Sequence, residues 1–115
     1  MFVRIAITLQ TIALLLQAVT AGLLLSSPGG RALHSVSAIA VVVTVLLHLV
    51  AAITTRQRNV ILPAVGAVAM TIVQIALGIA HVKSLHVPLG VVMFGVSLLR
   101  FGQVWAERRT PVAVA

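Results

Sequence analysis

Four long apolar stretches dominate the chain, and short polar segments separate them. They cover about residues 3–25, 32–54, 60–80 and 85–106. A helix needs roughly 20 apolar residues to cross a bilayer, so each stretch is long enough to span once. Together they use nearly all of the 115 residues. The pattern predicts an all-α fold, an integral membrane four-helix bundle that forms one transmembrane domain over residues 1–115.

The first stretch also has features of a signal peptide, since Arg4 precedes it and small residues follow. Its length of some twenty residues exceeds the apolar part of a typical signal peptide. It also contains Gln10 and Gln17. These features favour a helix that is retained in the mature protein.

Composition supports a membrane location. Hydrophobic residues make up 61% of the chain and charged residues 8%, whereas about a quarter of residues are charged in soluble domains. The chain has no cysteine, which excludes disulfides, thiolate metal sites and covalent heme attachment. The net charge of +7 comes from residues scattered at helix ends, so nucleic acid is not an expected partner. One lysine against seven arginines is typical of a GC-rich bacterial genome.

The distribution of basic residues predicts an orientation. Arg31 and Lys83 fall on one side of the membrane. The opposite side carries five arginines: Arg4, Arg56, Arg58, Arg108 and Arg109. Because basic residues concentrate in short cytoplasmic segments, both termini and the middle loop are expected in the cytoplasm of a bacterial plasma membrane.

The chain also repeats itself. Residues 32–39 align with residues 84–91, so that His34 matches His86, and Gln17 with Gly22 echoes Gln74 with Gly78. Each half is therefore a helical hairpin. Two spans separate the copies, so both hairpins have the same orientation, and the repeated histidines are expected to face each other at one depth near the external surface.

Facing histidines at one depth suit the two axial positions of a heme iron. Imidazole nitrogens bind metals at about 2 Å, and a helix bundle can supply them from opposite helices. Arg31 and Lys83 each lie three residues before a histidine, where they could pair with the heme propionates. His81 is a further candidate donor. Taken singly, each histidine could instead be a hydrated residue at the membrane interface.

Gln17 and Gln74 lie on helix stripes that should face the bundle interior. They are candidate contacts to a cofactor or quinone, although hydrogen bonds that fix helix packing are the alternative. Small residues on the helices, namely Gly22, Ser37, Gly78 and Gly90, would leave room for a flat macrocycle.

Residues Gln74–Gly78, followed by a short loop, Leu85–Gly90 and Phe94, resemble the third and fourth helices of one four-helix half of heme A synthase. The resemblance implies that His34 and His86 are the axial ligands of one heme b on the external side. The catalytic half of that family has a glutamate where this chain has Arg31. The resemblance therefore implies a heme-holding scaffold rather than an enzyme that hydroxylates heme.

His48 follows His34 by 14 residues, about 21 Å along a helix and on nearly the same face. Diheme cytochromes b use this spacing, but the repeat places Arg100 opposite His48, and arginine is not an iron ligand. The preferred interpretation is that both are polar residues near the cytoplasmic ends, with Arg100 reaching the surface. A proton or quinone path remains an alternative.

The sequence therefore predicts a small b-type cytochrome or heme carrier that handles electrons or heme at the external face. Its expected partners are the lipid bilayer and a respiratory or other membrane complex or a quinone, and a homo-oligomer remains open. The competing hypothesis is a heme-free structural or assembly subunit of a larger membrane complex. No nucleophile or carboxylate pair lies within the spans, which argues against hydrolytic chemistry.

Overall fold

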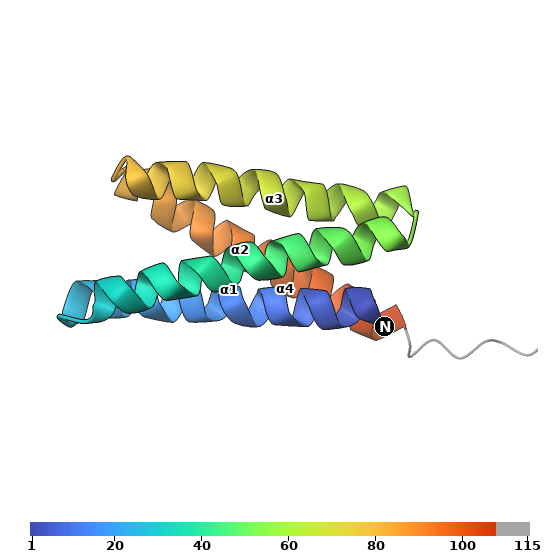
Figure 1. Ribbon diagram of the computed structural model, residues 1–115, viewed down its shortest axis with the longest axis horizontal. Coiled ribbons are helices and arrows are strands. Elements are labelled where there is room, and N and C mark those ends of the chain that lie inside the picture. The colour runs from blue at the N-terminus through green and yellow to red at the C-terminus, as the bar shows by residue number, and fades with distance from the viewer. Residues whose placement is uncertain (108–115) are drawn as a thin grey trace, which may run out of the picture.

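The computed structural model describes residues 1–107, and these form four long helices joined by short loops (Figure 1). The helices are α1 (Phe2–Ser26), α2 (Gly30–Thr54), α3 (Arg58–Ile79) and α4 (Lys83–Ala106). All four are long and apolar enough to cross a membrane. The all-α four-helix bundle predicted from the apolar stretches is confirmed.

The last three helices begin about two residues earlier than the apolar pattern predicted. Their first turns include basic residues, namely Arg31, Arg58 and Lys83. Long basic side chains can extend from a helix end toward water while the backbone stays helical. Hydropathy alone therefore placed these boundaries slightly too late.

Two ends of the bundle can be distinguished. Loops 27–29 and 80–82 lie at one end, which we call the hairpin end, and the N-terminus, loop 55–57 and the end of α4 lie at the other, the terminal end (Figure 1). Both hairpins therefore point the same way, as the repeat predicted. Arg108 and Arg109, which contributed to the predicted orientation, lie outside the described residues.

The helices are arranged in a ring in which each contacts its two neighbours. Within residues 1–107, the backbone of α1 lies close to those of α2 and α4, and the backbone of α3 lies close to those of α2 and α4, whereas the diagonal pairs meet only through side chains. Figure 1 shows that α3 and α4 meet at their loop and then diverge, with α4 crossing toward the start of α1. The first turn of α2 lies against the end of α1, since a side chain on Gly30 would overlap the backbone of Leu23. Only glycine fits at this position.

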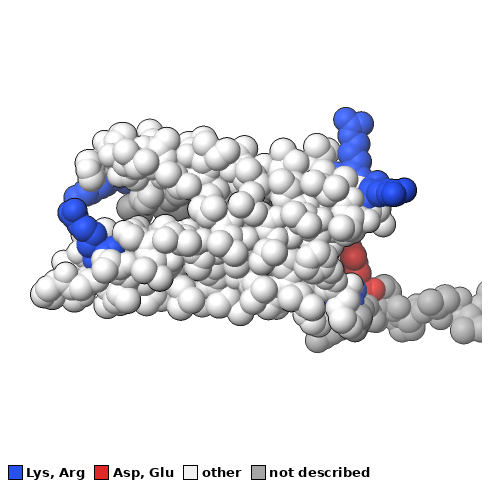
Figure 2. All heavy atoms as spheres, in the orientation of Figure 1, with Lys and Arg blue, Asp and Glu red and all other residues white. Residues whose placement is uncertain are grey.

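A narrow apolar core runs along the middle of the ring. It is built from buried residues of α1, α2 and α4: Ala13, Leu14, Val41, Val45 and Met93. Most other large apolar side chains point outward, such as Leu15, Val36 and Leu99. Such an outer surface suits lipid rather than water. Figure 2 shows basic side chains at the two ends and none over the middle of the visible face.

Candidate functional site

His34 and His86 lie side by side at the hairpin end. His34 is in the second turn of α2, and His86 is near the start of α4. Their ring centres are 6.4 Å apart, and the ring planes form an angle of 69°. The structure therefore brings together the two residues that the sequence repeat predicted to face each other.

His34 belongs to a closed set of hydrogen bonds with three polar residues, which we call the His34 network: Gln17, Thr20, His34 and Ser37. The Gln17 amide nitrogen is 3.2 Å from Nε2 of His34, and the Thr20 hydroxyl is 3.3 Å from Nδ1. The Thr20 and Ser37 hydroxyls are 2.7 Å apart. The Ser37 hydroxyl donates to the Gln17 side-chain oxygen, which closes the ring of contacts.

The chemistry of these groups fixes the tautomer of His34. An amide nitrogen can only donate, so Nε2 of His34 must accept, and Nδ1 then carries the proton. Nδ1 donates to the Thr20 hydroxyl, which can donate in turn to Ser37. Nε2, the nitrogen that would bind a metal, is therefore deprotonated and covered by the Gln17 amide.

His86 has the same tautomer by a different route. Its Nδ1 donates to the backbone oxygen of Gln74 at 3.0 Å, and the Gln74 amide nitrogen donates to the backbone oxygen of His86 at 2.7 Å. Nε2 has no hydrogen-bond partner among residues 1–107, and it is not among their buried unpaired side-chain atoms. His86 therefore presents an accessible nitrogen lone pair on an imidazole that the backbone holds in place.

Two glycines make room for this pair of contacts. A side chain on Gly78 would come within 3.1 Å of the His86 ring, and one on Gly90 within 2.9 Å of the Gln74 amide. Gly22, by contrast, has open space around it. The sequence hypothesis assigned all three small residues to a macrocycle, but two of them accommodate side chains of the site itself.

The chain matches no family model, and no curated protein or solved structure is significantly similar to it.

The remaining residues singled out from the sequence lie around the histidine pair. Arg31 and Lys83 are exposed in the first turns of α2 and α4, about one turn further out than the histidines. Neither side chain has a hydrogen bond or ion pair within the described part of the chain. Figure 2 shows basic side chains on both sides of a hollow at the hairpin end. His81 is exposed in the loop, where its φ of 57° closes the turn after α3.

No group of three or more histidine or carboxylate side chains within residues 1–107 could hold a bare metal ion. The two facing imidazoles offer two nitrogen ligands. A group that brings its own equatorial ligands, as a porphyrin does, needs no more than two from the protein.

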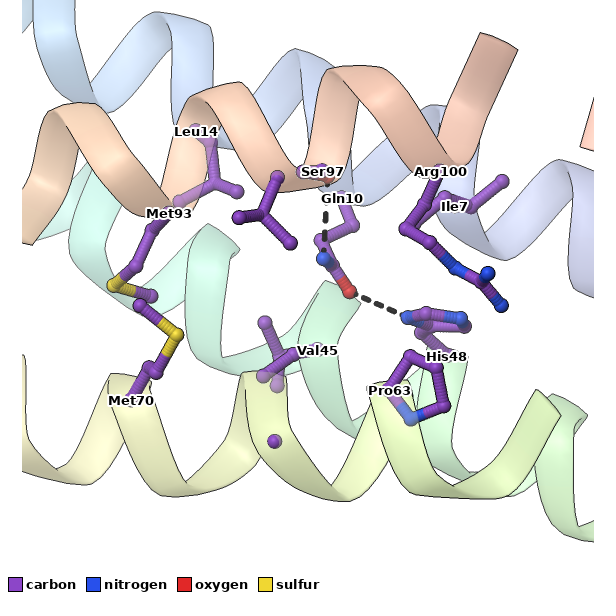
Figure 3. A pocket seen from close by; sticks show the side chains of 13 residues that line it. Ile7, Gln10, Leu14, Val45, His48, Pro63, Met70, Met93, Ser97 and Arg100 are labelled. Atoms are coloured by element: carbon purple, nitrogen blue, oxygen red, sulfur yellow. Dashed lines mark hydrogen bonds between the residues drawn. The ribbon is translucent and has the colours of Figure 1, made fainter. Parts of the chain in front are cut away.

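A second polar group, which we call the His48 cluster, lies deeper in the bundle and comprises Gln10, Thr11, His48 and Ser97. The Thr11 and Ser97 hydroxyls are 2.8 Å apart. His48 is only 5% exposed, and its Nδ1 lies 2.8 Å from the Gln10 side-chain oxygen. The Gln10 amide nitrogen donates to the Ser97 hydroxyl at 3.2 Å (Figure 3). The sequence indicated only that His48 is a polar residue near the cytoplasmic end of its helix, and the structure shows that it is a buried member of a network.

Arg100 lies beside the His48 cluster and donates a hydrogen bond to a backbone oxygen that has no partner within its own helix. Pro63 has no N–H, so the backbone oxygen of Asn59 lacks its usual helical donor. Arg100 donates to that oxygen at 3.4 Å and to the Gln103 side-chain oxygen at 2.9 Å. Arg100 and His48 line one cavity, so the repeat correctly paired these two positions.

Proposed function

We propose that the chain is a membrane-embedded b-type heme-binding protein with His34 and His86 as the axial ligands. The observation that carries the proposal is the 6.4 Å separation of the two imidazole centres. Two iron–nitrogen bonds of about 2 Å each, with about 1 Å from each nitrogen to its ring centre, require a separation of about 6 Å. Little movement of the two helices is needed to satisfy that distance.

The tautomers of both histidines support the same proposal. Histidine ligands commonly donate their second ring N–H to a carbonyl or another acceptor, which orients the ring and leaves the other nitrogen for the metal. Nδ1 of His86 donates to the Gln74 backbone, and Nδ1 of His34 donates to Thr20. Ligation by His34 requires one change, the withdrawal of the Gln17 amide from Nε2.

The basic residues of the hairpin end would hold the propionates. Arg31 and Lys83 are about one turn outside the axial pair, and neither is engaged with another described side chain. Charge-assisted hydrogen bonds to carboxylates are about twice as strong as neutral ones. A heme bound in this way supplies one-electron redox chemistry, so we propose a role in electron transfer or heme handling at the membrane surface.

We propose further that the hairpin end faces the outside of a bacterial plasma membrane. Arg31 and Lys83 lie at that end, whereas Arg4, Arg56 and Arg58 lie at the terminal end, and basic residues favour the cytoplasmic side. Alkaline phosphatase, which is active only outside the cytoplasm, is expected to be inactive when it is fused after Ala115 and active when it is inserted after Pro28. The reverse pattern would refute this orientation.

A heme-free assembly subunit is the second candidate, and the His34 network favours it. That network satisfies Gln17, Thr20, His34 and Ser37 without any ligand. Interhelical hydrogen bonds of this kind stabilise membrane bundles by about 0.6–2 kcal/mol each. The two candidates differ in one property, the affinity for heme.

A titration of the purified protein with hemin in lipid nanodiscs separates them. The heme proposal predicts saturation at one hemin per chain, with a sharp Soret band and the visible bands of a six-coordinate low-spin iron. A spectrum that remains that of hemin dissolved in lipid would favour the assembly subunit.

A further inference from the structure

The deep cavity beside the His48 cluster is separate from the histidine pair. It has a volume of about 190 Å³ and is lined by residues of all four helices. Its walls are mostly apolar, with Ile7, Leu14, Val45, Met70 and Met93 among them, and its polar members include His48 and Arg100 (Figure 3). We propose that this cavity binds the head group of a membrane quinol.

The polar atoms of the cavity define the hydrogen bonds that a ligand must make. The Gln10 side-chain oxygen accepts from Nδ1 of His48, because its amide nitrogen already donates to Ser97. Nε2 of His48 is therefore an acceptor, and it has no hydrogen-bond partner within residues 1–107. Arg100 uses two of its five N–H groups on Asn59 and Gln103, which leaves three donors.

One acceptor and one group of donors suit a hydroxyl on a ring. A quinol hydroxyl donates to Nε2 of His48, and its oxygen accepts from the Arg100 guanidinium, which lies next to the imidazole in Figure 3. A charged phosphate group is a poorer match. Gln10 and Ser97 are already hydrogen-bonded to each other, and the remaining walls are apolar, so they would strip a phosphate of water without replacing its hydrogen bonds.

The size of the cavity fits one ring. An apolar cavity of about 150 Å³ is enough to bind benzene, so about 190 Å³ accommodates one six-membered ring with its oxygen substituents. A prenyl or alkyl tail would have to remain outside.

The cavity also reaches the outer surface of the bundle, where such a tail could lie. Gly66 and Val96 line it, and both are exposed, with Val96 48% exposed. Both residues lie well inside the candidate spans. The opening therefore faces lipid, so a ligand would enter from the bilayer rather than from water.

This proposal does not depend on heme, because it uses none of the residues of the histidine pair. The test is isothermal titration calorimetry of the full chain in quinone-free nanodiscs, with decylhydroquinone as the ligand. Decylbenzene, which has the same ring and tail but no oxygen, is the matched control ligand. The expected result is saturable binding at one site per chain, with decylbenzene at least about tenfold weaker because the hydrogen bonds are missing.

Two variants test whether the ligand binds at His48 and Arg100. His48→Asn keeps an amide N–H for Gln10 and removes the Nε2 acceptor, and Arg100→Gln removes the guanidinium. Each is expected to weaken decylhydroquinone binding about tenfold and leave decylbenzene unchanged. Thr44→Ala, on α2 but outside the cavity, is the control and is expected to bind like the wild type.

The wild-type comparison is decisive even if a variant fails to fold. Binding of decylhydroquinone no tighter than that of decylbenzene would overturn the proposal. Wild-type affinity in both folded variants would overturn it as well. If the protein binds decylhydroquinone as expected but binds no heme, only the histidine-pair proposal is refuted.

Discussion

At the residue scale, the most informative contact is the one between Gln17 and His34. The amide of Gln17 occupies Nε2 of His34, whereas Nε2 of His86 is open. The two proposed axial positions are therefore unequal, and only one of them requires a hydrogen bond to break before a ligand binds. In the heme proposal, the Gln17 amide must therefore leave the His34 nitrogen before that nitrogen can bind iron.

Replacing Gln17 with Ala is expected to make hemin binding faster, by about three- to tenfold, because one neutral hydrogen bond contributes about 0.5–1.5 kcal/mol. Stopped-flow absorbance at the Soret band measures the rate. Gln103→Ala, at the terminal end, is the matched control and is expected to leave the rate unchanged. Slower binding in Gln17→Ala would mean instead that the amide holds His34 in its binding position.

At the element scale, Gly78 of α3 packs against the His86 ring of α4. The His86 ring lies where a side chain at position 78 would project, whereas Gly22 in α1 faces open space. Gly78→Val is expected to displace His86 and lower the free energy of unfolding by about 1–3 kcal/mol, the usual cost of overpacking. Gly22→Val, the matched control, is expected to stay within about 0.5 kcal/mol of wild type.

Reversible unfolding in mixed detergent and SDS, followed by circular dichroism, measures both glycine variants. Equal stabilities of the two would show that the His86 ring can move away from Gly78 at little cost. The close packing of this hairpin would then be unimportant for stability.

The sequence predicted the helices well because each span is a continuous apolar run, and the repeat placed His34 opposite His86. It could not predict which polar side chains bond to each other. The seven-residue spacing of Gln10 and Gln17 puts both on one stripe, but the rotation and offset of neighbouring helices decide their partners. Those quantities depend on packing, such as the close approach at Gly30.

At the scale of the whole molecule, polar residues are separated into two groups within an apolar bundle. The histidine pair and the His34 network lie at the hairpin end, and the His48 cluster lies in the other half. His34 and His48 are about 21 Å apart along α2. The first group lies at one end of the bundle and the second lines a cavity between the four helices, so the bundle has two distinct polar sites.

The central claim is that the two facing imidazoles bind one heme iron, and its most direct test is the electron paramagnetic resonance spectrum of the hemin-loaded variants. The account predicts a low-spin ferric signal in wild type and in His48→Asn. It predicts a high-spin signal, or loss of heme, in both His34→Ala and His86→Ala. A wild-type low-spin signal in either alanine variant would contradict the account.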